Sequence, residues 1–191
     1  MSTGGLDNVR EAAELLRAIA RAGAEGNLPF LVIGGLAVVE HGYGRTTEDM
    51  DLMIRRADRP AWTERFGLLG YREWRDGGSF VHYEQTKPDG LPLDAMLVSE
   101  GTFAKLHGAA VPCAMLGVPV LIPCLNHLLA LKLHAIRHTR GTRGVKDMGD
   151  IVTLIEKNHL DVTTPDFRKL CDEFGTPEAY ESIQRLFGDK H

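Results

Sequence analysis

The sequence predicts an α/β (α+β) fold, in which a mixed β-sheet with flanking helices is followed by a helical C-terminal part. Three observations support this class. Short apolar runs at residues 29–33 and 50–54 alternate with segments of helical periodicity. Two later apolar runs enclose the turn-rich segment 87–90, which favours a hairpin and therefore a mixed sheet. From residue 125 onward the periodicity is helical.

The first third of the chain alternates helix and strand. Residues 8–24 carry apolar side chains at helical spacing with arginines and glutamates around them, which predicts an amphipathic helix. The apolar run 29–33 ends at Gly34-Gly35, as a buried strand does when it stops at a sharp turn. A short helix, a second strand and a second helix are expected next, at residues 36–41, 50–54 and 59–69.

The middle of the chain is read as strands and the last third as helices. Further strands are expected at residues 80–83 and 93–98. Residues 111–123 predict a short hairpin, because apolar β formers flank Gly117 and the prolines confine the segment to sheet edges. The C-terminal helices are expected at residues 125–138, 145–157, 165–174 and 177–187.

No repeat or linker divides the 191 residues, so we expect one compact unit. In it, residues 125–191 form a helical part packed on a core of residues 1–124. The net charge of −4 argues against a protein that holds nucleic acid through bulk positive charge. No apolar run reaches the roughly 20 residues that span a bilayer, and the first residues lack a basic segment followed by an apolar one. We therefore expect a cytoplasmic protein without membrane contact.

The cysteines and histidines are assigned no chemistry. Cys113, Cys124 and Cys171 are an odd number at spacings that match no zinc or CxxC pattern, so packing in the core is the preferred interpretation. The eight histidines are interpreted as structural or surface residues.

Gly34-Gly35 stands where a strand hands over to a helix. A turn without side chains lets backbone amides and the positive end of the helix approach an anion such as a phosphate. Taken alone, such a pair is more often a tight turn and nothing else.

Three acids are placed in apolar strands. Residues two apart in a strand point to the same face, so Asp49 and Asp51 would stand together, which is costly unless a cation neutralises them. The alternative is a solvated strand face. Asp94 is an isolated acid in a third apolar strand, where a cap or salt bridge is as good an explanation as a metal. Together the three form an all-oxygen set suited to Mg²⁺.

These motifs resemble a known signature. Ile33-Gly34-Gly35, then thirteen residues, then Asp49-Met50-Asp51-Leu52, with Leu93-Asp94-Ala95 further on, resembles the nucleotidyltransferase signature of the DNA polymerase β superfamily. The denser match over residues 34–52 resembles the small bacterial branch that includes abortive-infection toxin nucleotidyltransferases. Residues 128–151 resemble that branch's helical segment, so the resemblance covers residues 28–157.

The resemblance implies a nucleotidyltransferase core and a two-metal site with Mg²⁺, for which Mn²⁺ can substitute. Asp49 and Asp51 would bridge both ions, and Asp94 would hold the ion next to the acceptor hydroxyl and help to remove its proton. Gly34-Gly35 would bring backbone N–H groups to the β and γ phosphates of ATP or another nucleoside triphosphate. The acceptor hydroxyl would attack the α phosphate in line and release pyrophosphate.

Three cationic features are candidates for phosphate or acceptor contact. Arg45 could offer its guanidinium to phosphate, or pair with a neighbouring acid to hold the loop. Lys132 lies on a leucine-rich helix and needs an anionic partner, either the triphosphate or the acids Asp147 and Asp150. The basic run 137–146 is read as a loop that either contacts a nucleotide or RNA or is a solvated connection.

The identity of the acceptor stays open. One interpretation is a toxin-type enzyme that modifies tRNA or protein, with an antitoxin as a further candidate partner. Another is a small-molecule enzyme of the antibiotic-adenylating kind. The third is a non-catalytic nucleotide-binding or partner-binding module, against which the three acids argue, because a binding module has no need of mutually repelling carboxylates.

Overall fold

The computed structural model describes residues 3–42, 49–87, 90–138 and 142–188. The chain divides into two compact units, which we call the sheet unit (residues 1–40 and 45–124) and the helical unit (residues 41–44 and 125–191). None of the described helices is long and apolar enough to cross a membrane.

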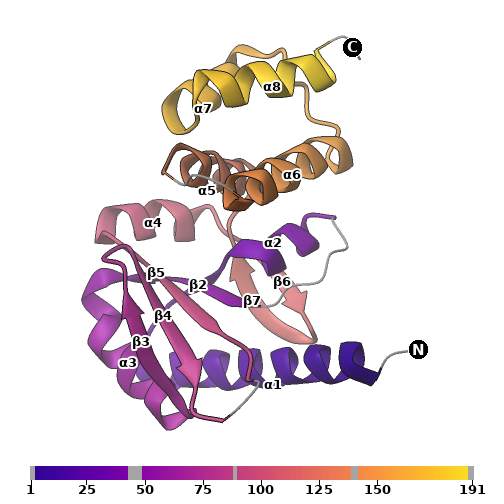
Figure 1. The fold of residues 1–191 in the computed structure, drawn as a ribbon. Helices are drawn as coiled ribbons and strands as arrows, with labels where there is room; N and C mark the ends of the chain where they lie inside the picture. The colour runs from indigo at the N-terminus through magenta and orange to yellow at the C-terminus, as the bar shows by residue number, and fades with distance from the viewer. Residues whose placement is uncertain (1–2, 43–48, 88–89, 139–141, 189–191) are drawn as a thin grey trace. The chain divides into compact units, whose positions relative to one another are not determined.

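The sheet unit contains five helical segments and seven strands among its described residues (Figure 1). In chain order these are α1 (Thr3–Gly26), β1 (Leu31–Val32), α2 (Gly34–Glu40), β2 (Met50–Arg55), the 3₁₀ turn η1 (Arg56–Asp58), α3 (Arg59–Leu68), β3 (Tyr71–Asp76), β4 (Phe80–Gln85), β5 (Leu93–Val98), α4 (Glu100–Gly108), β6 (Val111–Met115) and β7 (Val118–Ile122). The helical unit consists of α5 (Leu125–His138), α6 (Thr142–Lys157), α7 (Pro165–Phe174) and α8 (Pro177–Phe187).

The main sheet has five strands in the order β1-β2-β5-β4-β3. β2 and β5 pair in parallel, while β1–β2, β4–β5 and β3–β4 pair antiparallel. The α/β class and the mixed sheet expected from the sequence are confirmed, as is the antiparallel pairing of the third and fourth expected strands.

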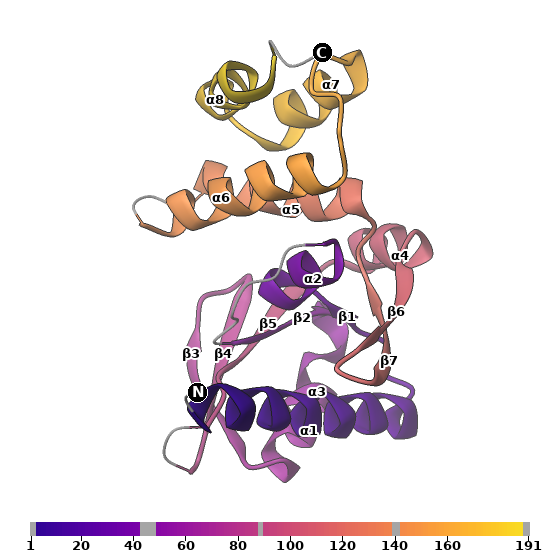
Figure 2. The ribbon, with the colours of Figure 1, turned by 90° about the vertical axis from the view of Figure 1, so that its right-hand side faces the viewer.

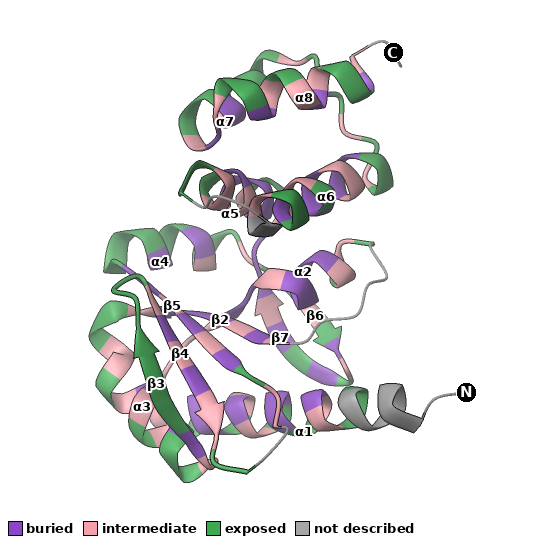
Figure 3. Ribbon diagram, in the orientation of Figure 1, coloured by how far each residue is buried: buried purple, intermediate pink, exposed green. Residues whose placement is uncertain are grey.

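β3 was not expected. It is the edge strand opposite β1, and Tyr71 is the one buried residue in it, as the exposed colouring of this strand in Figure 3 makes visible. An edge strand that is exposed on both sides has no apolar alternation, and periodicity therefore does not detect it.

The two faces of the sheet have different covers. α1 and α3 lie on one face, and α2 and α4 lie on the other (Figures 1 and 2). The face under α3 holds an aromatic core, in which Trp62 stacks on Phe66 at 5.2 Å between ring centroids and Phe66 meets Tyr83 edge-on at 5.0 Å. We call the second face the acid face, because Asp51 and Asp94 lie on it.

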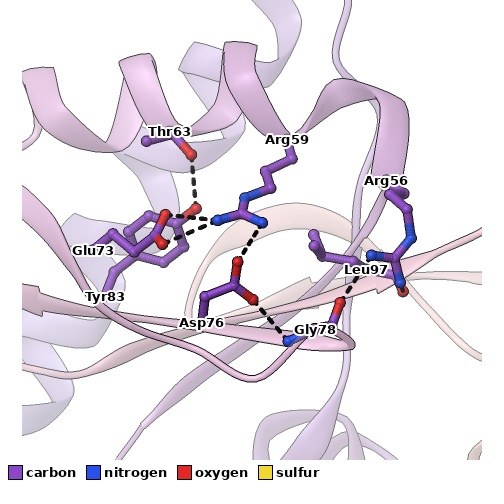
Figure 4. A network of polar contacts seen from close by, with 8 residues as sticks. All are labelled: Arg56, Arg59, Thr63, Glu73, Asp76, Gly78, Tyr83 and Leu97. Atoms are coloured by element: carbon purple, nitrogen blue, oxygen red, sulfur yellow. Dashed lines mark hydrogen bonds and ion pairs between the residues drawn. The ribbon is translucent and has the colours of Figure 1, made fainter.

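A polar network ties α3 to β3 and β4 on the core side (Figure 4). Arg59 donates hydrogen bonds of 2.8 Å to Asp76 and 3.0 Å to Glu73, and the hydroxyls of Thr63 and Tyr83 are 2.8 Å apart. The N–H of Gly78, together with Arg59, holds the pKa of Asp76 below its ordinary value. These contacts fix the otherwise exposed edge strand, and they do so on the face away from the acids.

β6 and β7 form the predicted hairpin as a separate two-stranded sheet. Leu116 and Gly117 join the strands, both with positive φ (50° and 75°), which is the backbone of a type I′ turn and matches the right-handed twist of the strands.

The helical unit begins its last two helices with side-chain caps. Thr164 accepts a hydrogen bond from the N–H of Phe167, and Thr176 accepts one from the N–H of Ala179. The prediction of a loop over residues 137–146 is wrong at both ends, because α5 runs to His138 and α6 begins at Thr142, so Lys146 lies inside a helix. Residues 139–141 of this segment lie outside the described residues. The glycine in the first turn of α6 suggested a loop, although a single glycine costs a helix only about 1 kcal/mol.

Candidate active site

Gly34 and Asp51 are in direct contact where β1 gives way to α2. Gly34 has a φ of +63°, the left-handed conformation that glycine adopts without strain. A Cβ atom built on Gly34 would lie 2.7 Å from the Cβ of Asp51 and would overlap its carboxylate. The N–H of the neighbouring Ile33 donates a 3.0 Å hydrogen bond to the backbone carbonyl of Asp51. The glycine therefore makes the sharp turn and also leaves room for the aspartate side chain.

Asp51 and Asp94 are register partners on the neighbouring parallel strands β2 and β5. Such partners are about 4.8 Å apart and point to the same face of a sheet. Both aspartates are half-buried, whereas the next register pair, Leu52 and Ala95, is fully buried on the opposite face. The fold thus brings two carboxylates together on the acid face, from segments more than forty residues apart.

His82 continues this row onto β4. It is the register partner of Asp94, and its Nδ1 lies 2.8 Å from Asp94 Oδ1. The two side chains are 19% and 15% exposed. On β3 the pairing shifts register between Glu73 and Arg75, and the indole of Trp74 at this irregularity lies 5.8 Å from the His82 ring. Trp74 is 56% exposed.

The other residues of the expected phosphate and metal site have different surroundings. Asp49 immediately precedes β2 and is half-buried. Gly35 is buried in the first turn of α2. Arg45 lies outside the described residues.

Lys132 belongs to the helical unit, where it is paired with two acids. Its Nζ is 2.8 Å from Asp147 Oδ1 and 2.7 Å from Asp150 Oδ2, and the lysine side chain is 11% exposed. Burial by itself lowers the pKa of Lys132, but the two carboxylates outweigh it, so the pKa is raised above its ordinary value. The acidic partners considered from the sequence are therefore both present.

The described residues do not by themselves form a complete metal-binding site. Among them, no group of three or more histidine, cysteine, aspartate or glutamate side chains lies close enough together to hold an ion. Asp51 and Asp94 nevertheless suit a hard divalent cation, because they supply oxygen donors from adjacent strand positions on one half-buried face.

Two histidine features were missed in the sequence. The sequence predicts a structural or surface role for His82, and only its register with Asp94 reveals the pairing, because the two residues are twelve positions apart. His134 and His138 are four residues apart on α5 with ring centroids 4.3 Å apart, an HxxxH spacing that the sequence itself contains. No third ligand accompanies that pair among the described residues.

Two kinds of comparison relate this chain to known proteins, by family and by fold. A family model described as "Uncharacterised nucleotidyltransferase" matches residues 6–187. No curated protein matches the chain.

Solved structures share the fold at low sequence identity. ANT(2″)-Ia in complex with adenylyl-2″-tobramycin is 18% identical, with 94% of this chain and 98% of that chain covered and a TM-score of 0.56. An antigenic nucleotidyltransferase-like protein from Paracoccidioides brasiliensis is 15% identical, covers 94% and 98%, and has a TM-score of 0.57. The lincosamide antibiotic adenylyltransferase LnuA, bound to lincomycin, is 14% identical, covers 71% and 91%, and has a TM-score of 0.52.

Proposed function

This chain belongs to the family of uncharacterised nucleotidyltransferases, and from that premise we propose that it transfers a nucleoside monophosphate from a nucleoside triphosphate to an acceptor hydroxyl, with release of pyrophosphate. One structural observation supports this activity independently of the family match. Asp51 and Asp94 stand in register on one half-buried sheet face, with the positive-φ Gly34 against the first of them. Two like charges so close are costly in a protein that does not use them to bind a cation.

Nucleotidyltransferases of this fold generally use divalent metal ions, and we propose Mg²⁺, with Mn²⁺ as a substitute and two ions per site. Asp51 and Asp94, which the parallel strands bring into register, would hold them, and Asp49, directly before the same strand, is the third candidate ligand. When bound, Mg²⁺ neutralises the triphosphate and lowers the pKa of a coordinated hydroxyl.

The residues of the chain have separate tasks in the proposed reaction. Gly34 and Gly35 offer backbone N–H groups to the triphosphate. Asp49 and Asp51 would hold the metal that, when bound, offsets the negative charge of the triphosphate. Asp94 accepts the proton of the acceptor hydroxyl as the oxygen–phosphorus bond forms and the bond to the leaving pyrophosphate breaks. Arg45 and Lys132 remain candidates for contact with the triphosphate.

We favour a small-molecule hydroxyl as the acceptor. Support comes from two structures of the same fold. One is ANT(2″)-Ia in complex with adenylyl-2″-tobramycin, and the other is the lincosamide antibiotic adenylyltransferase LnuA. The toxin-type alternative, with tRNA or protein as acceptor and an antitoxin as partner, has no comparable support among the comparisons. The experiment below therefore includes tRNA and protein as a second class of acceptor.

The test is incubation of the full chain with each α-labelled nucleoside triphosphate and Mg²⁺, in parallel with an aminoglycoside, a lincosamide, total tRNA and a protein lysate. Mass spectrometry of the small molecules and gel analysis of the polymers identify the labelled product. The Asp51→Asn variant, prepared identically, is the control for contaminating transferases.

We expect label on a small molecule, with pyrophosphate formed in equal amount, and none in the variant. Label on tRNA or protein would show that the acceptor is a polymer and not a small molecule, and the proposed nucleotidyl transfer would still stand. A chain that labels no acceptor and binds no triphosphate in the presence of Mg²⁺ would overturn the proposed function.

A further inference from the structure

His82 joins the acid face to the edge of the sheet. It lies between Asp94, whose carboxylate it contacts at 2.8 Å, and Trp74, whose ring lies 5.8 Å from its own. The three side chains come from the neighbouring strands β5, β4 and β3. The imidazole and the carboxylate are both more than four-fifths shielded from solvent, so their contact is not a loose surface pair.

The direction of this hydrogen bond follows from its chemistry. An ionised carboxylate can only accept a hydrogen bond. Nδ1 of His82 therefore carries a hydrogen atom and donates the hydrogen bond to Asp94 Oδ1. One oxygen of Asp94 is thereby held by His82. A carboxylate with one oxygen fixed has lost most of its freedom to rotate, which is what a ligand or a base needs before its substrate arrives.

Trp74 in turn restricts His82. The register shift in β3 sets Trp74 and Arg75 together opposite His82, so the indole is directed onto the same face as the imidazole. An exposed tryptophan on an edge strand has no core to fill, and Trp74 is 56% exposed. Its ring contact with His82 gives it a task at this position.

We propose that His82 is a positioning residue for the transfer reaction, which holds the Asp94 carboxylate in the orientation needed beside the acceptor hydroxyl, and that Trp74 holds His82. The proposal rests on the proposed function, because it assigns to Asp94 a role in the reaction. When a residue that orients such a carboxylate is removed, activity or metal affinity typically falls about 10- to 100-fold.

Two substitutions of His82 separate positioning from packing. His82→Ala removes the donor, whereas His82→Asn retains one, because the asparagine amide nitrogen lies close to the position of Nδ1. The matched control is His107→Ala on α4, a histidine of the same unit that also contacts an aromatic ring, that of Phe103 at 5.3 Å. The variants Trp74→Ala and Trp74→Phe test whether an aromatic ring in contact with His82 is needed.

The readouts are kcat and the KM for the triphosphate, and separately the Kd for Mn²⁺ of the protein without nucleotide, measured by electron paramagnetic resonance. For His82→Ala we expect kcat to fall about 10- to 100-fold, and Mn²⁺ to bind more weakly, while the triphosphate KM changes less than about twofold. His82→Asn restores most of both losses. Trp74→Ala shows a smaller fall in kcat, and Trp74→Phe and His107→Ala are close to wild type.

Wild-type kcat and Mn²⁺ affinity in folded His82→Ala would overturn the proposal, and so would a loss that His82→Asn does not repair. Tighter Mn²⁺ binding in His82→Ala would overturn it too, since His82 would then be holding Asp94 away from the ion. If the wild-type chain labels no acceptor and binds no triphosphate, the proposed function fails, and the Mn²⁺ affinities still decide whether His82 orients Asp94.

Discussion

The carboxylate of Asp51 fills the space in which any side chain on residue 34 would lie. Gly34 also has a φ of +63°, so conformation and space independently require glycine at this position. The contact joins the glycine turn and the acidic strand, two motifs that are seventeen residues apart in the sequence, into one structural element. Changes on either side of it should therefore affect the candidate site together.

Gly34→Ala should abolish transfer and destabilise the protein. The left-handed backbone costs an alanine about 1–2 kcal/mol, and the added methyl group must displace the Asp51 side chain. Urea unfolding and the labelled-triphosphate assay measure the two effects. Gly67→Ala in α3 is the control, because nothing lies within 4 Å of its added carbon. Full activity in Gly34→Ala would show that the position of Asp51 is not critical.

Asp51→Asn should abolish nucleotide transfer and leave the melting temperature unchanged or higher. The substitution removes a charge that repels its register partner Asp94 in the metal-free protein, and it also removes a metal ligand. Calorimetry and the transfer assay give the two results. A variant that transfers nucleotide at the wild-type rate would contradict the assignment of Asp51.

A nucleoside triphosphate should protect the protein from heat only when Mg²⁺ or Mn²⁺ is present. Carboxylates on the acid face repel a triphosphate unless a cation lies between them. At a hundredfold excess over the Kd the expected stabilisation is about 2.7 kcal/mol. Thermal denaturation with and without a chelator tests this. Equal protection in excess chelator would mean that the acids do not hold a metal.

Lys132→Met should lower the free energy of unfolding by about 3–5 kcal/mol, because it leaves the buried Asp147 and Asp150 without their cation. Adding Asp147→Asn and Asp150→Asn should recover most of the loss. The raised pKa of Lys132 sets the pH dependence: the stabilisation is complete below the unfolded value of about 10.4 and is lost as the pH rises through the higher folded value. The difference between wild type and Lys132→Met should therefore shrink in strong alkali.

The same variant tests the proposed contact with triphosphate. The ammonium has three N–H donors, and it pairs with both acids within the helical unit. On protein confirmed to be folded, calorimetry should show triphosphate binding weakened by about 1–3 kcal/mol, with nucleoside binding little changed. Unchanged triphosphate affinity would limit Lys132 to the ion pairs of the helical unit.

The sequence by itself determined the features that depend on neighbouring residues. The strand predicted over residues 50–54, the glycine turn and the hairpin after residue 110 each follow from local alternation and turn chemistry, and all three are present. The oddity of Asp51 and Asp94 could be recognised in the same way, because a charged residue inside an apolar strand is visible without knowing its partners.

Only the tertiary structure decided which of these residues meet. Strand β3 has no apolar pattern and forms because β4 supplies its hydrogen bonds and Arg59 its ion pairs. His82 and Trp74 reach the acid face through strand register, and Lys132 acquires two acids through the packing of α5 against α6. Register and packing are fixed by the burial of whole faces, so one residue's own segment does not contain them.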